Sequence, residues 1–179
     1  MSQDQYRGSV RIDNVSIIFG DNVAESLALA DAGKSRTEIQ EATGDVLGVH
    51  DCTVDIKEGE ILVLMGLSGS GKSTLLRAIN RLNPISRGTL TVHCGEETFD
   101  VGACDDKTLM QLRMDTISMV FQQFGLLPWR SVADNVGFGL EIAGVPKKER
   151  DRRVAEQLEL VGLSDWAERM VAELSGGMQ

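Results

Sequence analysis

A glycine-rich stretch that ends in lysine and serine is the part of this 179-residue sequence best suited to chemistry. It runs from Gly66 to Ser73 and fits the pattern G-x-x-x-x-G-K-[ST]. An apolar segment at 61–65 precedes it, and a helix-like segment at 74–80 follows it. A chance glycine-rich turn would lack these neighbours, so the sequence predicts a phosphate-binding loop between a strand and a helix.

The residue types in this loop suit the dense negative charge of a polyphosphate. Glycines permit backbone conformations that turn several N–H groups inward, and the helix that follows adds its free N–H groups and the positive end of its dipole. We predict that Lys72 reaches the β- and γ-phosphates and that the Ser73 hydroxyl binds Mg²⁺. The predicted nucleotide-binding residues of the loop are Gly66, Ser68, Gly69, Ser70, Gly71, Lys72, Ser73 and Thr74.

Size and composition are those of one globular domain with a core, since 42% of the residues are apolar and 25% are charged. The net charge of -9 argues against binding to nucleic acid or to anionic lipid, both of which attract basic surfaces. Three cysteines without C-x-x-C spacing favour neither a disulfide framework nor a zinc site and fit a reducing cytoplasm. The sequence contains neither a secretory signal pattern nor an apolar run of membrane-spanning length, so we expect any membrane role to require a protein partner.

Hydrophobic periodicity and turn residues predict the elements that must hold the loop. Strands are predicted at 10–19, 46–49, 52–56, 61–65, 89–92, 98–101 and 117–121. A helical insert at 23–44 precedes the loop, and its second helix opens with a capping box from Ser35 to Glu38 and ends at Gly44. Further helices are predicted at 106–113, 131–143, 146–161 and 164–172, so that residues 131–179 form a mostly helical subdomain.

Three motifs follow one another in a set order: the loop at 66–73, Val120-Phe121-Gln122 after a strand, and Leu174-Ser175-Gly176-Gly177 after a helical segment. Together they resemble the ATP-binding cassette (ABC) ATPases over essentially the whole chain. The resemblance implies an α/β fold in which a P-loop NTPase core carries an antiparallel β subdomain and a helical subdomain. Residues 1–179 would then form an ABC nucleotide-binding domain.

The same resemblance implies ATP and Mg²⁺ as ligands and gives further residues their roles. Phe19 would stack on the adenine ring, and the alternative is a core phenylalanine on an edge strand. Gln122 would touch Mg²⁺ or the attacking water, with Gln123 as the rival for that role. Lys72 and Gln122 are then the catalytic residues, and Ser73 and Gln122 are the metal ligands.

The segment Ser175-Gly176-Gly177 lies where a helix would begin and resembles a second backbone anion site. In the family such a site closes on the nucleotide of a second subunit, which implies a homodimer with ATP between the subunits. A simple glycine helix cap is the alternative. The apolar loop at 124–130 resembles part of the groove that receives a cytoplasmic helix of a membrane permease, and the alternative is a satellite core under the helical subdomain.

The insert and the run at 126–130 resemble the quaternary-amine importer branch, choline transport ATPases first and glycine betaine/proline ATPases next. This implies the ATP-binding subunit of an ABC importer, which couples ATP binding and hydrolysis to uptake of a quaternary amine. Its partners would be an integral-membrane permease, a second ATPase subunit and, indirectly, an extracytoplasmic solute-binding protein, at the cytoplasmic face of the plasma membrane. Two alternatives stay open: a soluble non-transport ABC ATPase, which the acidic net charge disfavours, and a non-catalytic nucleotide-binding fragment.

The sequence ends at Gln179, directly after the third motif. ABC ATPases continue with a strand that ends in a Mg²⁺-binding Asp and a catalytic Glu, and with a later His; His50 and His93 lie upstream of that place. We therefore expect the C-terminal part of the core sheet to be missing and apolar edges to be exposed. We expect this chain alone to bind nucleotide but to hydrolyse it poorly, because no carboxylate orients the water.

Overall fold

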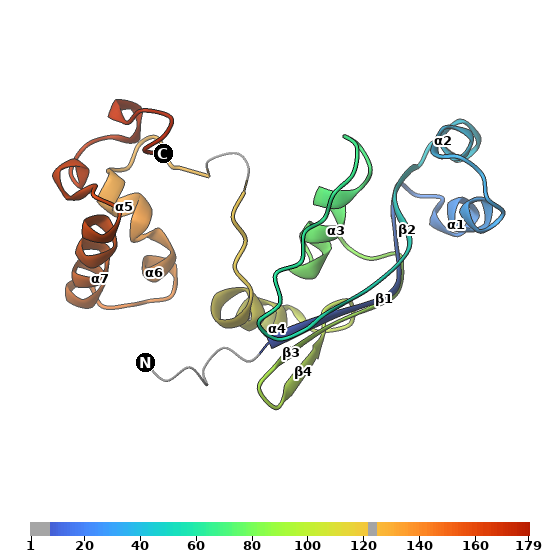
Figure 1. Ribbon diagram of the computed structural model, residues 1–179, viewed down its shortest axis with the longest axis horizontal. Helices are drawn as coiled ribbons and strands as arrows, with labels where there is room; N and C mark the ends of the chain where they lie inside the picture. The colour runs from blue at the N-terminus through green and yellow to red at the C-terminus, as the bar shows by residue number, and fades with distance from the viewer. Residues whose placement is uncertain (1–7, 122–124) are drawn as a thin grey trace. The chain divides into compact units, whose positions relative to one another are not determined.

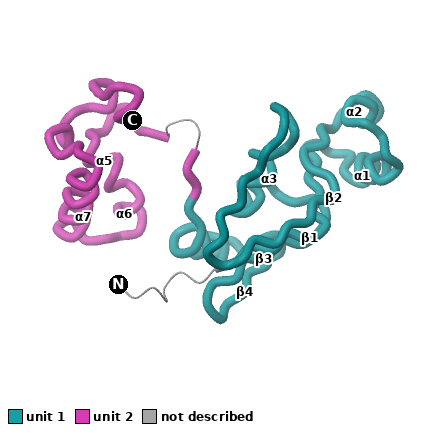
Figure 2. Tube along the Cα trace, in the orientation of Figure 1, with its two compact units in different colours: residues 1–118 teal, residues 119–179 magenta. Residues whose placement is uncertain are grey.

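The computed structural model describes residues 8–121 and 125–179. They fall into two compact units, residues 1–118 and residues 119–179, which Figure 2 distinguishes by colour. No helix in the described ranges is both long and apolar enough to span a lipid bilayer.

The first unit is built on one antiparallel sheet of four strands (Figure 1). The strands in spatial order are β2 (Val46–Ile56), β1 (Gly8–Phe19), β3 (Arg87–Cys94) and β4 (Glu97–Asp100). The antiparallel β subdomain is therefore confirmed, as are its strands at 10–19, 89–92 and 98–101. The two strands predicted within 46–56 are one, because Asp51 takes a left-handed backbone (φ 46°) at an irregularity in the register without ending the pairing.

A short helix, α3 (Lys72–Ile79), packs on this sheet. Leu75 and Ala78 are 6% and 1% exposed and point from the helix into the main hydrophobic core. Full burial of a side chain such as Leu75 contributes about 1.5–3 kcal/mol to stability. The buried members of this core are Ile12, Val15, Ile17, Val49, Leu75, Ala78, Leu90, Val92 and Val101.

The predicted helical insert is present as α1 (Val23–Asp31) and α2 (Arg36–Thr43). Its capping box forms as expected: Glu38 N–H donates to Ser35 Oγ at 3.3 Å, and Ser35 N–H donates to Glu38 Oε2 at 2.8 Å. Gly44 ends α2 with a φ of 78°. A second small core joins the insert to the strands through Ile18, Ala30, Ile39 and Leu47.

Asp31, at the end of α1, ties the insert to two strands of the sheet. Both terminal nitrogens of the Arg87 guanidinium, Nη1 and Nη2, donate to its carboxylate, at 2.7 and 2.8 Å, and His50 Nε2 lies 3.0 Å from Oδ1. The hydrogen bonds from Arg87 and then from His50 hold the pKa of Asp31 well below its usual range.

The strands predicted at 61–65 and 117–121 do not form. Ile61 and Val120 are 92% and 96% exposed, and neither segment pairs with any strand among residues 8–121 and 125–179. An apolar run carries the propensity for a strand, but a strand exists only where a neighbour accepts its backbone hydrogen bonds. The helix predicted at 106–113 is present as α4 (Asp106–Gln111) and continues as a π-helix, η2 (Leu112–Thr116).

The second unit is helical, as expected for residues 131–179. The helix predicted at 131–143 is two helices, because Gly137 interrupts it, and the one predicted at 146–161 is confirmed. The elements are α5 (Val132–Val136), α6 (Phe138–Ile142), α7 (Lys147–Leu160) and two 3₁₀ turns, η3 (Ser164–Trp166) and η4 (Val171–Glu173).

The prediction of a helix at 164–172 is wrong, since only the two 3₁₀ turns form there. The carbonyls of Ala167 and Arg169 accept hydrogen bonds from the N–H groups of Ala133 and Val132, both at 2.9 Å. The carbonyls of this segment therefore accept hydrogen bonds from the first N–H groups of α5 instead of forming the bonds of a helix of their own. The core of the unit gathers around Val132, Val154 and Leu158.

Replacement of Asp31 by asparagine should weaken the attachment of the insert in a pH-dependent way. The folded state lowers the pKa of Asp31 from its ordinary value of 3.8, so its ion pair stabilises the fold above about pH 4 and loses that effect as the pH falls. Urea unfolding should show Asp31→Asn less stable than wild type at pH 7, with the difference shrinking from about pH 4 downward. Asp21→Asn, in the exposed turn after β1, is the control and should follow the wild-type profile. A deficit in Asp31→Asn that does not change with pH would contradict this account.

Candidate functional site

The predicted phosphate-binding loop leads directly into α3. Ser70 N–H donates to Leu67 O at 3.2 Å and closes a turn, and Gly71 then caps the helix with a φ of 97°. The first residue of α3 is Lys72, and Leu75 N–H donates to Gly71 O at 2.9 Å. The free N–H groups at the start of this helix and the positive end of its dipole therefore face the loop.

The loop touches β2 so closely that two positions have no space for a side chain. A Cβ atom on Gly71 would lie 2.4 Å from Gly48 O. One on Gly48 would lie 2.8 Å from Phe19 Cε2 and 3.0 Å from Thr74 Cγ2. Glycine at 48 and 71 thus allows the strand, the aromatic ring and the start of the helix to meet.

Lys72 bends back over the loop that precedes it. Its ammonium donates to Gly66 O at 2.9 Å, to Leu67 O at 2.7 Å and to Ser70 Oγ at 3.2 Å. The Lys72 ammonium therefore lies between the loop backbone and the start of α3. An anion that approaches this point meets the ammonium together with the N–H groups of the helix start.

A pocket of about 350 Å³ joins the loop to the end of β1. Phe19 lies at the end of that strand, opposite Val46, and is 40% exposed. The structure thus brings Phe19 together with residues 69–74, as the resemblance implied, and its stacking on adenine stays a prediction. The residues around the pocket are Phe19, Arg36, Gln40, Val46, Leu47, Gly48, Gly69, Ser70, Gly71, Lys72, Ser73 and Thr74.

Five of these residues were not foreseen from the sequence: Val46, Leu47 and Gly48 on β2, and Arg36 and Gln40 on α2. Arg36 and Gln40 lie one turn apart, so the insert forms one wall of the pocket. The sequence shows that Arg36 and Gln40 share one face of a helix. It does not show which way that face points, because this depends on how the insert packs. Gly66 and Ser68 are outside the pocket wall: Gly66 O accepts from Lys72, and Ser68 is exposed in the turn.

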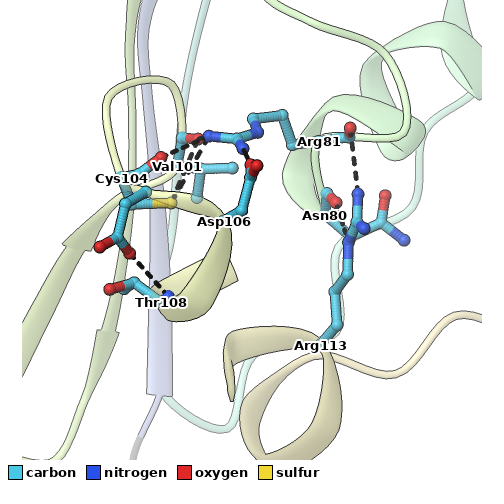
Figure 3. A network of polar contacts seen from close by, with 8 residues as sticks. Asn80, Arg81, Val101, Cys104, Asp106, Thr108 and Arg113 are labelled. Carbon is cyan, nitrogen blue, oxygen red and sulfur yellow. Dashed lines mark hydrogen bonds and ion pairs between the residues drawn. The ribbon is translucent and has the colours of Figure 1, made fainter. Parts of the chain in front are cut away.

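Side chains also fix the far end of the helix that starts at the loop, as Figure 3 shows. Arg113 Nε donates to Asn80 O at 3.0 Å, and its Nη2 donates to Arg81 O at 3.2 Å. Arg81 in turn donates to Cys104 O at 2.6 Å and forms an ion pair with Asp106 at 2.9 Å. Cations on the last carbonyls complement the negative end of the helix dipole. Helix α3 is therefore held at both ends.

The third motif lies in the second unit. Ser175 O accepts hydrogen bonds from the N–H groups of Met178 at 2.9 Å and Gln179 at 3.2 Å, so Gly176 and Gly177 form a turn with helix-like bonds. Its role as an anion site stays a prediction. Gln122 and Gln123, the candidates for the metal-contacting glutamine, lie outside the described residues.

The described part of the apolar loop, residues 125–130, contains both a pocket-lining and an exposed side chain, and Phe124 lies outside the described residues. Leu126 lines an apolar pocket of about 470 Å³ in the second unit, whereas Trp129 is 71% exposed. Asn135 holds the loop: its amide accepts from Leu127 N–H at 2.7 Å and donates to Leu127 O at 3.1 Å. Leu126 thus shares this pocket with Val132 and Leu158 of the core of the second unit, whereas Trp129 remains available for contact.

Comparison with known proteins agrees with the expectation from the sequence. The family model described as ABC transporter matches residues 49–179. The glycine betaine/carnitine transport ATP-binding protein GbuA of Listeria monocytogenes is 42% identical over 170 residues, which are 95% of this chain and 42% of that protein. The glycine betaine/proline betaine transport system ATP-binding protein ProV of Escherichia coli is 41% identical over 170 residues, again 95% of this chain and 42% of that protein. The chain thus spans less than half the length of these curated relatives.

A solved structure gives the same result for the fold. The ATP-binding cassette MJ0796, in a dimeric post-hydrolysis state bound to ADP and Pi, matches with a TM-score of 0.70 and 29% sequence identity. The match covers 94% of this chain and 64% of that one. The predicted ABC cassette fold is therefore confirmed.

The contact between the loop and β2 makes a test of two neighbouring glycines possible. Gly69→Ala places a Cβ in open space at a φ of 78° and should destabilise the fold by about 1–2 kcal/mol. Gly71→Ala has a φ of 97° and also forces a Cβ against Gly48 O, so it should cost at least about 1 kcal/mol more. Urea unfolding of both variants measures the difference. Equal stability of the two would show that the close approach to β2 does not constrain the loop.

Proposed function

The chain belongs to the ABC transporter family, and on that premise we propose that it is the nucleotide-binding part of the ATP-binding subunit of a quaternary-amine importer. The observation that carries the proposal is the pocket in which Phe19 and residues 69–74 meet. A polyphosphate would lie on the loop and the start of α3, with the base near Phe19. The proposed activity is ATP binding and hydrolysis coupled to solute uptake.

The geometry around Lys72 suits a triphosphate. Its ammonium now donates to two loop carbonyls and a hydroxyl within 3.2 Å, and phosphate oxygens would replace these acceptors with stronger, charged ones. Because the charge of the triphosphate is dense, the start of α3 adds to the attraction. Lys72 is therefore our candidate for the residue that contacts the β- and γ-phosphates.

Ser73 is suited to a Mg²⁺ ion bound with the nucleotide. It is exposed, lies on the first turn of α3 and lines the pocket. Mg²⁺ accepts a hydroxyl oxygen together with phosphate oxygens and waters, so one side-chain ligand here is chemically sufficient. When bound, the ion neutralises charge on the phosphates during phosphoryl transfer. Gln122, which lies outside the described residues, is the residue we propose as the second Mg²⁺ ligand or as the contact to the attacking water.

The proposed solute is glycine betaine or a related quaternary amine such as choline. Two relatives with glycine betaine in their names are 41% and 42% identical over 95% of this chain. The solute itself contacts the permease and an extracytoplasmic binding protein, so the ATP-binding subunit supplies energy rather than solute recognition.

The proposed assembly is a homodimer with ATP between the subunits, joined to an integral-membrane permease at the cytoplasmic face of the membrane. The similar cassette of known structure is dimeric and holds ADP and Pi. Ser175, Gly176 and Gly177 would act on the nucleotide of the second subunit, through backbone N–H groups. The exposed Trp129 fits a contact with the permease.

Mg-ATP binding should depend on Lys72. Loss of its charge-assisted contacts in Lys72→Ala should weaken binding by about tenfold to a hundredfold. The measurement is a titration of the 179-residue chain with a fluorescent ATP analogue and Mg²⁺. Lys107→Ala removes an exposed lysine from α4 and is the control, with wild-type affinity expected. Equal affinity of wild type and Lys72→Ala would place the nucleotide elsewhere.

A chimera tests the importer function. Residues 9–179 would replace the matching segment of ProV in Escherichia coli cells that lack their own copy. The chimera should restore glycine betaine uptake, and the same chimera with Lys72→Ala should not. Loss of uptake by a chimera that is produced, folded and binds Mg-ATP would favour a non-transport ABC ATPase or a purely regulatory nucleotide-binding part.

A further inference from the structure

The helical insert reaches the phosphate loop through one side chain, Arg36. Its Nη2 donates to Gly48 O at 3.1 Å and to Ser70 O at 3.2 Å, and its Nη1 donates to Gly69 O. One guanidinium thus joins α2, β2 and the loop. We propose that Arg36 is a positioning residue, which sets the geometry of the loop from the pocket wall formed by α2 and thereby controls nucleotide affinity. This inference rests on the proposed function of the same loop.

The effect follows from the planarity of the peptide bond. The C=O and the next N–H of a trans peptide point in opposite directions. Arg36 holds the carbonyls of Gly69 and Ser70, so the N–H of Gly71 is turned to the side away from the guanidinium. Without this hold, two glycines at 69 and 71 leave the loop many alternative conformations.

Arginine suits this task better than another cation. Its planar fork presents several N–H donors in fixed directions, so that one side chain contacts three carbonyls on two segments. Lysine would bring a compact ammonium on a flexible stem, without the planar fork that matches these three carbonyls on two segments.

The helix that carries Arg36 is itself well anchored. The capping box at Ser35 and Glu38 fixes its first turn, and Ile39 is fully buried in the small core that joins the insert to the sheet. Asp31 ties the preceding helix to Arg87 and His50. The guanidinium therefore extends from a fixed support, which a positioning role requires.

Lys34, two residues away, allows a comparison with a second cation of the same insert. Its ammonium forms an ion pair with Glu38 at 2.9 Å, within the insert. Removal of either cation changes the net charge equally at nearly the same place, but only Arg36 contacts the loop. Lys34→Gln is therefore the matched control for Arg36→Gln.

The test compares Arg36→Gln, Arg36→Lys and Lys34→Gln in the 179-residue chain. Hydrogen exchange of the peptide 66–72 without nucleotide reports the order of the loop, and exchange of α2 reports the integrity of the insert. A fluorescent ATP analogue with Mg²⁺ then gives the affinity. Arg36→Gln should speed exchange in the loop and weaken binding, each by about tenfold, and Lys34→Gln should change neither.

Arg36→Lys separates position from charge. The proposal expects it to keep α2 protected but to leave the loop in fast exchange, with affinity between those of wild type and Arg36→Gln. Wild-type protection of the loop in Arg36→Lys would overturn the proposal, since charge alone would then suffice. If Arg36→Gln also speeds hydrogen exchange in α2, its effect on the loop could come from damage to the insert. Exchange of the loop in Arg36→Lys, with α2 protected, then decides whether the proposal holds.

The two readouts also separate this inference from the proposed function. If the wild-type chain fails to bind Mg-ATP, the proposed function fails, whereas hydrogen exchange still tests the contact. If wild type and Arg36→Gln bind equally well, only the role of Arg36 is refuted.

Discussion

The close approach of the phosphate loop to β2 is the constraint on which the rest of the first unit depends. At Gly71 a side chain would overlap Gly48 O, and at Gly48 it would overlap Phe19 and Thr74. These missing side chains place the aromatic ring, the strand and the start of α3 within van der Waals contact. Because the helix is only eight residues long, its orientation also needs the Arg113 and Arg81 contacts at its far end.

The insert matters for the site because it lies beside this contact between the phosphate loop and β2. It follows β1 directly after Phe19 and returns to the sheet at Val46, so both of its ends lie at the edge of the pocket beside the loop. Its small core and the Asp31 ion pairs fix it there, and Arg36 then spans the gap to the loop. A segment that looks like a separate addition in the sequence thus forms a wall of the site.

Tertiary contacts also explain where strong local patterns failed. Residues 61–65 and 117–121 have strand-like composition, yet neither forms a strand, because a ladder needs a partner that donates and accepts. Residues 164–172 have helical periodicity, but Ala167 and Arg169 use their carbonyls to satisfy the start of α5. In each case the partners available to the backbone hydrogen bonds, and not the propensity of the side chains, decided which secondary structure formed.

The sequence by itself determined the features that depend on neighbours along the chain. The spacing of Gly66, Gly71, Lys72 and Ser73 specified the loop and the helix after it, and Ser35 and Glu38 specified the start of α2, since caps and turns are short-range. Only the tertiary structure decided that Arg36 meets Gly69, 33 residues away, and that Gly48 must be glycine. Such contacts depend on how whole elements pack, and a pattern within one element carries no information about the direction it will face.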